Sequence, residues 1–362
     1  MKPSTMFCSS RFNRSFIRKL NSNYVTRNNI PSYIFPSNLS LHTEKILPST
    51  FSNVPIIFAK LNYLINYKGV EAHPFIPQFF KKNAQGGRII LDALGLLKES
   101  DRMNDNTPYI WRHNSEPFAT TTGRNVIYGP SLASLNKNSW PLVINPATGF
   151  LYVLLDFAQQ EPAIAACFAN DQELLAAYLA GDLYLHIGSH PHLAGLDRDS
   201  LKKLVLPHSY GQSAAAYAKE HKIPLEVAQR YWRALKEIFY RVDAELNHRS
   251  QLAFRDGYVN CLDWAARVTP LSNLLAVRNW PVQAAGADIM RRAVIGLVEA
   301  GIDLRLTIHD GFLLRVPIAE QEQQIAKAIT VLKQASALVL DGFELNVKVD
   351  GIYDGQISGE MM

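Results

Sequence analysis

The chain has 362 residues, of which 48% are hydrophobic and 19% charged, enough to bury a large core and to form more than one subdomain. Its three cysteines (Cys8, Cys167 and Cys261) have neither disulfide-framework nor metal-ligand spacing, which excludes a disulfide scaffold and indicates a reducing compartment. No apolar run reaches the roughly 18 residues of a membrane span, so we expect no membrane partner.

The net charge of +5 is unevenly distributed. Residues 1–70 contain nine Lys and Arg residues against one acid, Glu44, a net charge of +8, so the remainder carries about −3. Residues 1–60 form a basic arm rich in Ser and Asn, which we expect to be disordered. Its composition resembles that of an organellar transit peptide or of a basic arm that touches nucleic acid. An extension without a function of its own is the third interpretation.

The rest of the chain alternates short β-type runs with helical patterns. Strands are expected at 150–155, 304–308, 312–316 and 343–349, with a strand or turn at 257–259. Helices are expected at 161–169, 171–180, 198–217 (with Pro207 inside), 224–254, 283–300 and 319–338. This pattern predicts an α/β (α+β) domain with a largely antiparallel sheet and a helical insertion.

Two aspartates stand at the ends of apolar strands, about 150 residues apart in the chain. Asp156 closes the run 150–155, and Asp310 follows 304–308 at the turn of a predicted hairpin. Converging carboxylates suit Mg²⁺, which prefers oxygen ligands and substrate phosphates. A two-metal site of this kind activates one oxygen and stabilises another during displacement at phosphorus. Two acids at ordinary turns are the alternative.

Six short motifs occur in an order and spacing that are similar to those of one enzyme family. They are Thr122-Gly123-Arg124, Asp156-Phe-Ala-Gln-Gln-Glu161, Arg198-x3-Lys202-x7-Tyr210-Gly211, Gly257-Tyr258-Val259 with Arg267, Asn279-Trp-Pro-Val-Gln283, and His309-Asp310. Together they resemble the polymerase domain of family A (Pol I-like) DNA polymerases, including the divergent short members of bacteria and mobile elements. The resemblance covers roughly 115–355.

The resemblance implies a right-hand polymerase architecture, with an antiparallel palm sheet, helical fingers and a reduced thumb. The implied regions are 61–121 for a partial thumb or connecting region, 122–197 and 271–362 for the two parts of the palm, and 198–270 for the fingers. It also implies that Asp156 and Asp310, with the Phe157 carbonyl, hold two Mg²⁺ ions, with Mn²⁺ as a possible substitute.

The same resemblance assigns residues to dNTP binding. Arg198 and Lys202, four apart on one helix face, would bind the triphosphate, although a solvated charged face is the alternative. Tyr210 resembles the aromatic residue at the template position. Glu161 stands where a side chain blocks a ribose 2′-hydroxyl, which favours deoxyribonucleotides; a helix N-terminal Glu stabilised by the macrodipole is the alternative.

Further polar residues complete the implied site. Gln159 and His186 are assigned to the nucleotide, the latter with a surface histidine as the alternative. The implied DNA contacts are Arg124, Arg267, Asn279, Gln283 and His309. Minor-groove acceptors lie in similar places for every base pair, so polar groups there permit geometry checking without sequence preference.

Three residues depart from the family pattern. Leu206 stands where most members carry an aromatic residue, which removes a stacking partner for the incoming base. Pro207 is expected to kink its helix or to remove a hydrogen bond. Gly311 replaces the acid that usually follows His-Asp, which we expect to change rate or metal affinity.

The sequence therefore predicts a DNA-directed DNA polymerase that adds dNTPs to a primer 3′-end. The chain ahead of Thr122 is too short for the usual proofreading domain, so we expect no 3′–5′ exonuclease. We also expect weak binding of duplex DNA. The sequence does not indicate whether a processivity partner is needed. We expect a cytoplasmic, nucleoid-associated bacterial protein, or organellar import if the arm is a transit peptide. Two alternatives are a catalytically silent remnant that binds primer–template DNA, and a hydrolase using Ser213 with His309 and Asp310.

Overall fold

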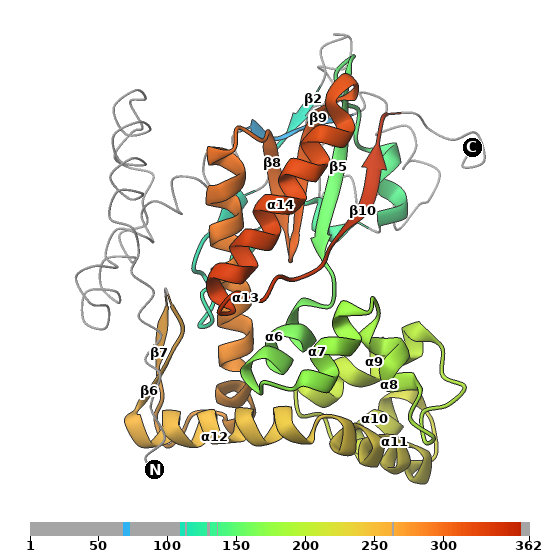
Figure 1. Ribbon diagram of the computed structural model, residues 1–362, viewed down its shortest axis with the longest axis vertical. Coiled ribbons are helices and arrows are strands. Elements are labelled where there is room, and N and C mark those ends of the chain that lie inside the picture. Colours follow the sequence, from blue (N-terminus) through green and yellow to red (C-terminus); the bar gives the residue numbers. More distant parts are fainter. Residues whose placement is uncertain are drawn as a thin grey trace. The chain divides into compact units, whose positions relative to one another are not determined.

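The computed structural model describes residues 68–72, 109–112, 114–128, 131–135, 137–262 and 264–355. The basic arm and most of 61–121 lie outside these residues, so the predictions for them stay predictions. Within the described part, the chain forms one four-stranded sheet, several two-stranded ribbons and a set of helices (Figure 1). None of the described helices combines the length and apolarity that a membrane crossing requires.

The four-stranded sheet is antiparallel throughout, with the order β10-β5-β9-β8. Its strands are β5 (Phe150–Phe157), β8 (Leu304–Ile308), β9 (Gly311–Pro317) and β10 (Val347–Tyr353). The central strand β5 is almost continuously apolar because both of its faces are covered. The predicted antiparallel α+β fold is thus confirmed.

Two long helices pack against each other and against this sheet (Figure 1). α13 (Leu274–Glu299) contacts β8, and α14 (Gln321–Val339) contacts β9 and β10. They approach closely at Gly296, where an added Cβ atom would lie 2.8 Å from a Val331 methyl carbon. α13 also contacts α6, α12 and β6, so it connects the sheet with the helical region.

The helical region follows β5 in the chain. Its helices are α6 (Gln160–Phe168), α7 (Gln172–Leu179), α8 (Leu183–Gly188), α9 (Arg198–Ser209), α10 (Ala214–His221), α11 (Leu225–Ile238) and α12 (Tyr240–Asp256). Asp171, Asp182, Asp197 and Ser213 cap α7, α8, α9 and α10, because each side chain accepts a backbone N–H of the first turn. The polar residues between the apolar runs therefore set where these helices begin.

The remaining elements are short. The ribbons pair β1 (Val70–Ala72) with β2 (Tyr109–Trp111), β3 (Asn114–Glu116) with β4 (Val126–Tyr128), and β6 (Tyr258–Asn260) with β7 (Ala265–Arg267). The 3-10 helices are η4 (Leu132–Ser134), η5 (Lys137–Leu142) and η6 (Ile318–Glu320).

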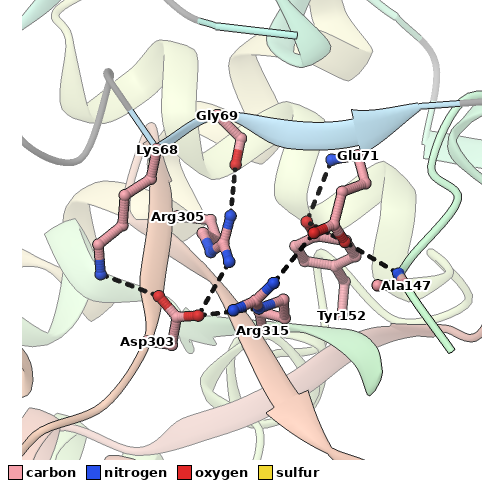
Figure 2. A network of polar contacts seen from close by, with 8 residues as sticks. All are labelled: Lys68, Gly69, Glu71, Ala147, Tyr152, Asp303, Arg305 and Arg315. Atoms are coloured by element: carbon pink, nitrogen blue, oxygen red, sulfur yellow. Dashed lines mark hydrogen bonds and ion pairs between the residues drawn. The ribbon is translucent and has the colours of Figure 1, made fainter. Parts of the chain in front are cut away.

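A partly buried polar network holds β1 against the sheet (Figure 2). The Glu71 carboxylate accepts hydrogen bonds from the Tyr152 hydroxyl at 3.2 Å, the Ala147 amide at 3.0 Å and Arg315 at 3.0 Å. Arg315 continues to Asp303, which also binds Lys68 at 2.9 Å. A buried carboxylate is stable only when it is paired in this way, so the network fixes the position of β1.

The core on one face of the sheet brings together β1, β5, β8, β9 and the segment 132–144. Tyr152 and Leu154 of β5 pack there with Trp140 and Ile144. Because side chains alternate along a strand, Asp156 lies on the same face as Tyr152 and Leu154, at the end of that face. The strand pattern thus delivers a carboxylate to the edge of an apolar core.

Several predicted element boundaries are wrong. The helix expected at 198–217 is two helices, because the chain turns at Gly211 (φ 83°) and Ser213 begins α10. The helix expected at 224–254 breaks at Phe239, whose buried ring packs against His208. In both regions tertiary packing or local capping outweighs the helical period.

Two further boundaries differ at the C-terminal end of the sequence. α13 begins at Leu274 rather than 283, since Asn273 caps it and Pro281 is accommodated inside the helix. The last strand runs from Val347 to Tyr353 rather than over 343–349. The segment ahead of this strand is not part of the sheet. Its residue Phe343 packs against the Tyr178 ring, with the ring centroids 5.9 Å apart.

Candidate active site

The sheet register brings the two predicted catalytic aspartates to one place. Asp156 on β5 lies directly opposite Gly311 on β9, and Asp310 immediately precedes Gly311 in the β8–β9 turn. The Phe157 amide donates to the Asp310 carbonyl at 3.4 Å. His309 makes the turn possible in the left-handed conformation (φ 54°). Residues far apart in the sequence therefore converge at one sheet end.

The two carboxylates repel each other in a partly buried site. Burial, followed by the charge of Asp156, raises the pKa of Asp310 to about 6. Both effects disfavour the ionised form of Asp310, and a cation bound between the two carboxylates would offset both. The electrostatics of this sheet end therefore favour cation binding.

The donor set fits magnesium. The oxygen donors here are the carboxylates of Asp156 and Asp310, which line one cleft together with Phe157, whose carbonyl stays a predicted ligand. Among the described residues, no group of three or more His, Cys, Asp or Glu side chains is arranged to hold a metal ion. Two carboxylates completed by substrate oxygens are the arrangement in which proteins commonly hold Mg²⁺.

The cleft has a volume of about 910 Å³ and is bounded by β5, α6, α9, α13 and the β8–β9 turn. It gathers most of the residues assigned from the sequence. Those lining it are Arg124, Asp156, Phe157, Gln159, Glu161, Arg198, Lys202, Tyr210, His309 and Asp310.

Glu161 lies between two side chains from other parts of the chain. One carboxylate oxygen pairs with Arg124, and the other accepts a hydrogen bond from the Tyr210 hydroxyl. Burial, followed by the hydrogen bond to Glu161, raises the pKa of Tyr210 to about 12. Glu161 is thus held by specific partners, in addition to standing in the first turn of α6.

Arg198 and Lys202 are one turn apart on α9, and both face the cleft. Arg198 pairs with Asp182 and stands 5.4 Å from the centroid of the Tyr184 ring. Lys202 is exposed. Arg198 and Lys202 therefore share one face of α9, as predicted, and Arg198 is already paired with the Asp182 carboxylate.

Gln159 has structural partners. In the left-handed conformation (φ 49°) it begins α6, and its side chain donates to Asp182 at 2.7 Å and accepts from the Leu183 amide at 3.1 Å. These bonds tie the turn after β5 to α8, so Gln159 orients the turn that follows Asp156. Its assignment to the nucleotide stays a prediction.

Four other predicted contacts lie outside the cleft lining. His186 stands 3.7 Å from Glu173 on α7, and Arg267 is exposed on β7. Asn279 and Gln283 on α13 line a small pocket behind Tyr210. The structure therefore does not bring these four residues to the two aspartates.

The departures from the family pattern also have definite places. Leu206 lines the cleft, and α9 continues through Pro207 to Ser209. Gly311 is the cross-strand neighbour of Asp156. Ser213 caps α10 through the Ala216 amide and does not line the cleft, so the geometry gives no support to a hydrolase using Ser213.

Sequence reasoning missed two residues of the site. Lys348 on β10 lies opposite Asp156, with its Nζ atom 3.2 Å from the Asp156 carboxylate. Asp182 binds both Arg198 and Gln159. The run Val347-Lys-Val349 indicates a strand with one charged face, but only the register shows which neighbour that charge meets.

The comparisons with known proteins agree with this geometry. The model of DNA polymerase family A matches residues 113–351. The thermostable DNA polymerase I of Thermus caldophilus is 28% identical over 304 residues, which cover 75% of this chain and 35% of the relative. The DNA polymerase of Mycobacterium phage L5 is 26% identical over 240 residues, which cover 64% of this chain and 39% of the phage protein. The chain thus spans about a third of the length of these curated relatives.

A solved structure shares the fold. It is the POL domain of Pol1 from M. smegmatis in complex with DNA primer-template and dNTP, with a TM-score of 0.58 and 21% sequence identity. The alignment covers 76% of this chain and 54% of that one. The matching fold confirms the predicted architecture. With a family model that matches about two thirds of its length, the chain belongs to DNA polymerase family A.

Proposed function

We propose that this chain catalyses template-directed DNA synthesis, in which dNTPs are added to a primer 3′-end. The observation that carries the proposal is the meeting of Asp156 and Asp310 in one cleft with Arg198 and Lys202. Carboxylates to hold cations and cations to hold phosphates are the two requirements of phosphoryl transfer.

Asp156 and Asp310, with the Phe157 carbonyl, would hold two Mg²⁺ ions, or Mn²⁺ in their place. When bound, such ions lower the pKa of the primer hydroxyl and neutralise charge on the triphosphate. Lys202 and Arg198 would bind the phosphates, and Arg198 would first have to leave Asp182.

Glu161 would exclude nucleotides that carry a ribose 2′-hydroxyl. Its carboxylate is held by Arg124 and Tyr210, so the space beside it is defined before a nucleotide enters. Arg124, Arg267, Asn279, Gln283 and His309 would contact primer–template DNA. Gln159 and His186 stay predicted nucleotide contacts. The absence of proofreading, a processivity partner, and the cytoplasmic, nucleoid-associated or organellar location likewise stay predictions.

The test is extension of a labelled primer on a template with four dNTPs and Mg²⁺ at low salt, because phosphate contacts weaken as ionic strength rises. Asp156→Asn and Asp310→Asn preserve side-chain shape, and each is expected to lower the extension rate by at least about a hundredfold. Asp256→Asn, on the exposed end of α12, is the matched control and should keep full activity.

The outcome also separates the polymerase from the silent remnant. Fluorescence anisotropy reports primer–template binding independently of extension. Binding by the wild type without any extension, in either Mg²⁺ or Mn²⁺, would replace the proposal with the remnant. Extension that survives both aspartate substitutions would show that the carboxylate pair is not the reaction centre.

A further inference from the structure

The immediate surroundings of Asp156 in the sheet contain a cation. Asp156 on β5 has two cross-strand neighbours, Gly311 on β9 and Lys348 on β10. Directly opposed residues of an antiparallel pair project from the same face within about 5.5 Å. Gly311 has no side chain, so of these two neighbours Lys348 alone carries one, and its Nζ atom lies 3.2 Å from Asp156 Oδ2.

A second carboxylate holds the same ammonium group. Lys348 Nζ donates to Asp350 Oδ1 at 2.8 Å, and Lys137 pairs with the other oxygen of Asp350. Asp350 is the extra residue of a β-bulge, since the register shifts between Val349 and Gly351. Bulges re-aim side chains, and this one places Asp350 beside the preceding lysine.

Lys348 can leave Asp156 without losing its charge partner. Its side chain is 49% exposed, whereas those of Asp156 and Asp350 are 16% and 17% exposed. Lys348 and Lys137 both line the cleft described above. An ammonium group that swings toward Asp350 therefore stays paired and partly hydrated, while the Asp156 carboxylate becomes available to another cation.

We propose that Lys348 is a built-in counter-cation of Asp156, which neutralises the Asp156 carboxylate in the metal-free protein and weakens the binding of divalent metal ions. The inference rests on the proposed function, because it takes Asp156 as a metal ligand. Lys348 is a positioning residue in this scheme. The ammonium group and a divalent ion compete for one carboxylate, and a retained positive charge nearby repels the ion.

The experiment measures Mn²⁺ binding without DNA or nucleotide, by the loss of the electron paramagnetic resonance signal of free Mn²⁺. Lys348→Met keeps the length of the side chain without its charge and should lower the Mn²⁺ Kd about tenfold. Lys348→Arg keeps the charge and should retain the wild-type Kd. Asp350→Asn removes the alternative partner and should raise the Kd, the opposite direction.

Thermal unfolding supplies a second readout. With a chelator present, Lys348→Met should melt below the wild type, because the partly buried Asp156 carboxylate loses its counter-charge. Added Mn²⁺ should then raise the Tm of Lys348→Met by more than that of the wild type. Lys333→Met, in the exposed pair with Glu344 at 3.7 Å, is the matched control and should change neither the Kd nor the response to Mn²⁺.

Asp156→Asn distinguishes the two levels of the proposal. In one outcome, Asp156→Asn weakens Mn²⁺ binding while folded Lys348→Met binds Mn²⁺ no more tightly than the wild type. This result would refute the proposed role of Lys348 and leave the role of Asp156 as a metal ligand intact. If Lys348→Met does not fold, an unchanged or lowered Kd in Asp350→Asn has the same meaning. Equal Mn²⁺ binding by the wild type and Asp156→Asn would overturn the metal site, and the inference with it.

Discussion

The Tyr210 hydroxyl at the end of α9 donates a hydrogen bond to the Glu161 carboxylate at the start of α6. This contact joins the helix that carries the predicted phosphate ligands to the turn that follows Asp156. If α9 moves relative to the sheet, either the hydrogen bond between Tyr210 and Glu161 breaks or the Glu161 side chain moves with α9. The proposed nucleotide selection by Glu161 is therefore expected to depend on the position of α9.

We predict that Glu161→Ala lowers discrimination against ribonucleotides by about tenfold to a hundredfold, because the side chain that excludes the 2′-hydroxyl is removed. The measurement is the ratio of kcat/KM for a dNTP and its rNTP in single-nucleotide extension. Glu161→Gln keeps the size of the side chain and should retain most of the discrimination. A wild-type ratio in Glu161→Ala would refute the assigned role.

The Glu71 network predicts a large effect on folding stability. Glu71→Ala leaves Tyr152 and part of Arg315 without an acceptor and should lower the free energy of unfolding by about 2–4 kcal/mol, measured by urea denaturation. Glu344→Ala removes an exposed ion pair and should cost less than about 0.5 kcal/mol. Equal effects of the two substitutions would contradict the structural role of the network.

Asp303 predicts a pH dependence of stability. Burial by itself raises the pKa of Asp303, but hydrogen bonds from Lys68 and Arg305 outweigh it and hold the pKa below its ordinary value. A carboxyl with a lowered folded-state pKa contributes stability above its unfolded-state pKa of about 3.9, and loses this contribution as the pH falls through the folded-state value. The wild type should therefore exceed Asp303→Asn in stability at pH 7 and approach it below about pH 4.

Urea denaturation of both proteins between neutral and acidic pH checks the Asp303 prediction. The slope with denaturant should stay the same, so that the comparison concerns stability and not the extent of unfolding. A difference between the two proteins that is constant over the whole range would mean that Asp303 contributes through packing alone.

The surroundings of Gly311 leave little room for a side chain beside the two aspartates. An added Cβ atom would lie 3.2 Å from the Ile308 carbonyl oxygen and 3.3 Å from both the Leu155 carbonyl oxygen and a Leu154 methyl carbon. Gly311→Ala should therefore lower the free energy of unfolding by about 1–3 kcal/mol, because backbone oxygens of a sheet cannot easily move. A stability equal to that of the wild type would show that the sheet end has room for a Cβ atom at position 311.

Much of the site was predictable because strand ends and helix faces are local properties. The apolar runs before Asp156 and Asp310 predict both strand ends, and the spacing of Arg198 and Lys202 predicts a common helix face. Capping residues such as Asp171 lie next to the helices they begin. These signals extend over a few residues, so they can be interpreted without knowledge of the rest of the chain.

The break at Phe239 and the places of His186 and Arg267 were not predictable in the same way. Phe239 interrupts a favourable helical period because its ring is buried against His208, a contact across 31 positions of sequence. His186 on α8 stands 3.7 Å from Glu173, a neighbour that its residue type does not indicate, and its assignment to the nucleotide stays a prediction. Whether a polar side chain faces the site depends on how the helices pack.

The sequence by itself determined the antiparallel α+β class and the two aspartates, since these follow from residue types at short spacing, and the family resemblance, which follows from the order of six short motifs. Only the tertiary structure decided which charges meet: Lys348 opposite Asp156, Asp182 on Arg198, and Arg124 with Tyr210 on Glu161. The physical reason is that strand register and helix packing arise from many weak contacts distributed over the whole domain. Electrostatic pairing depends on distances of a few ångströms that these contacts set together.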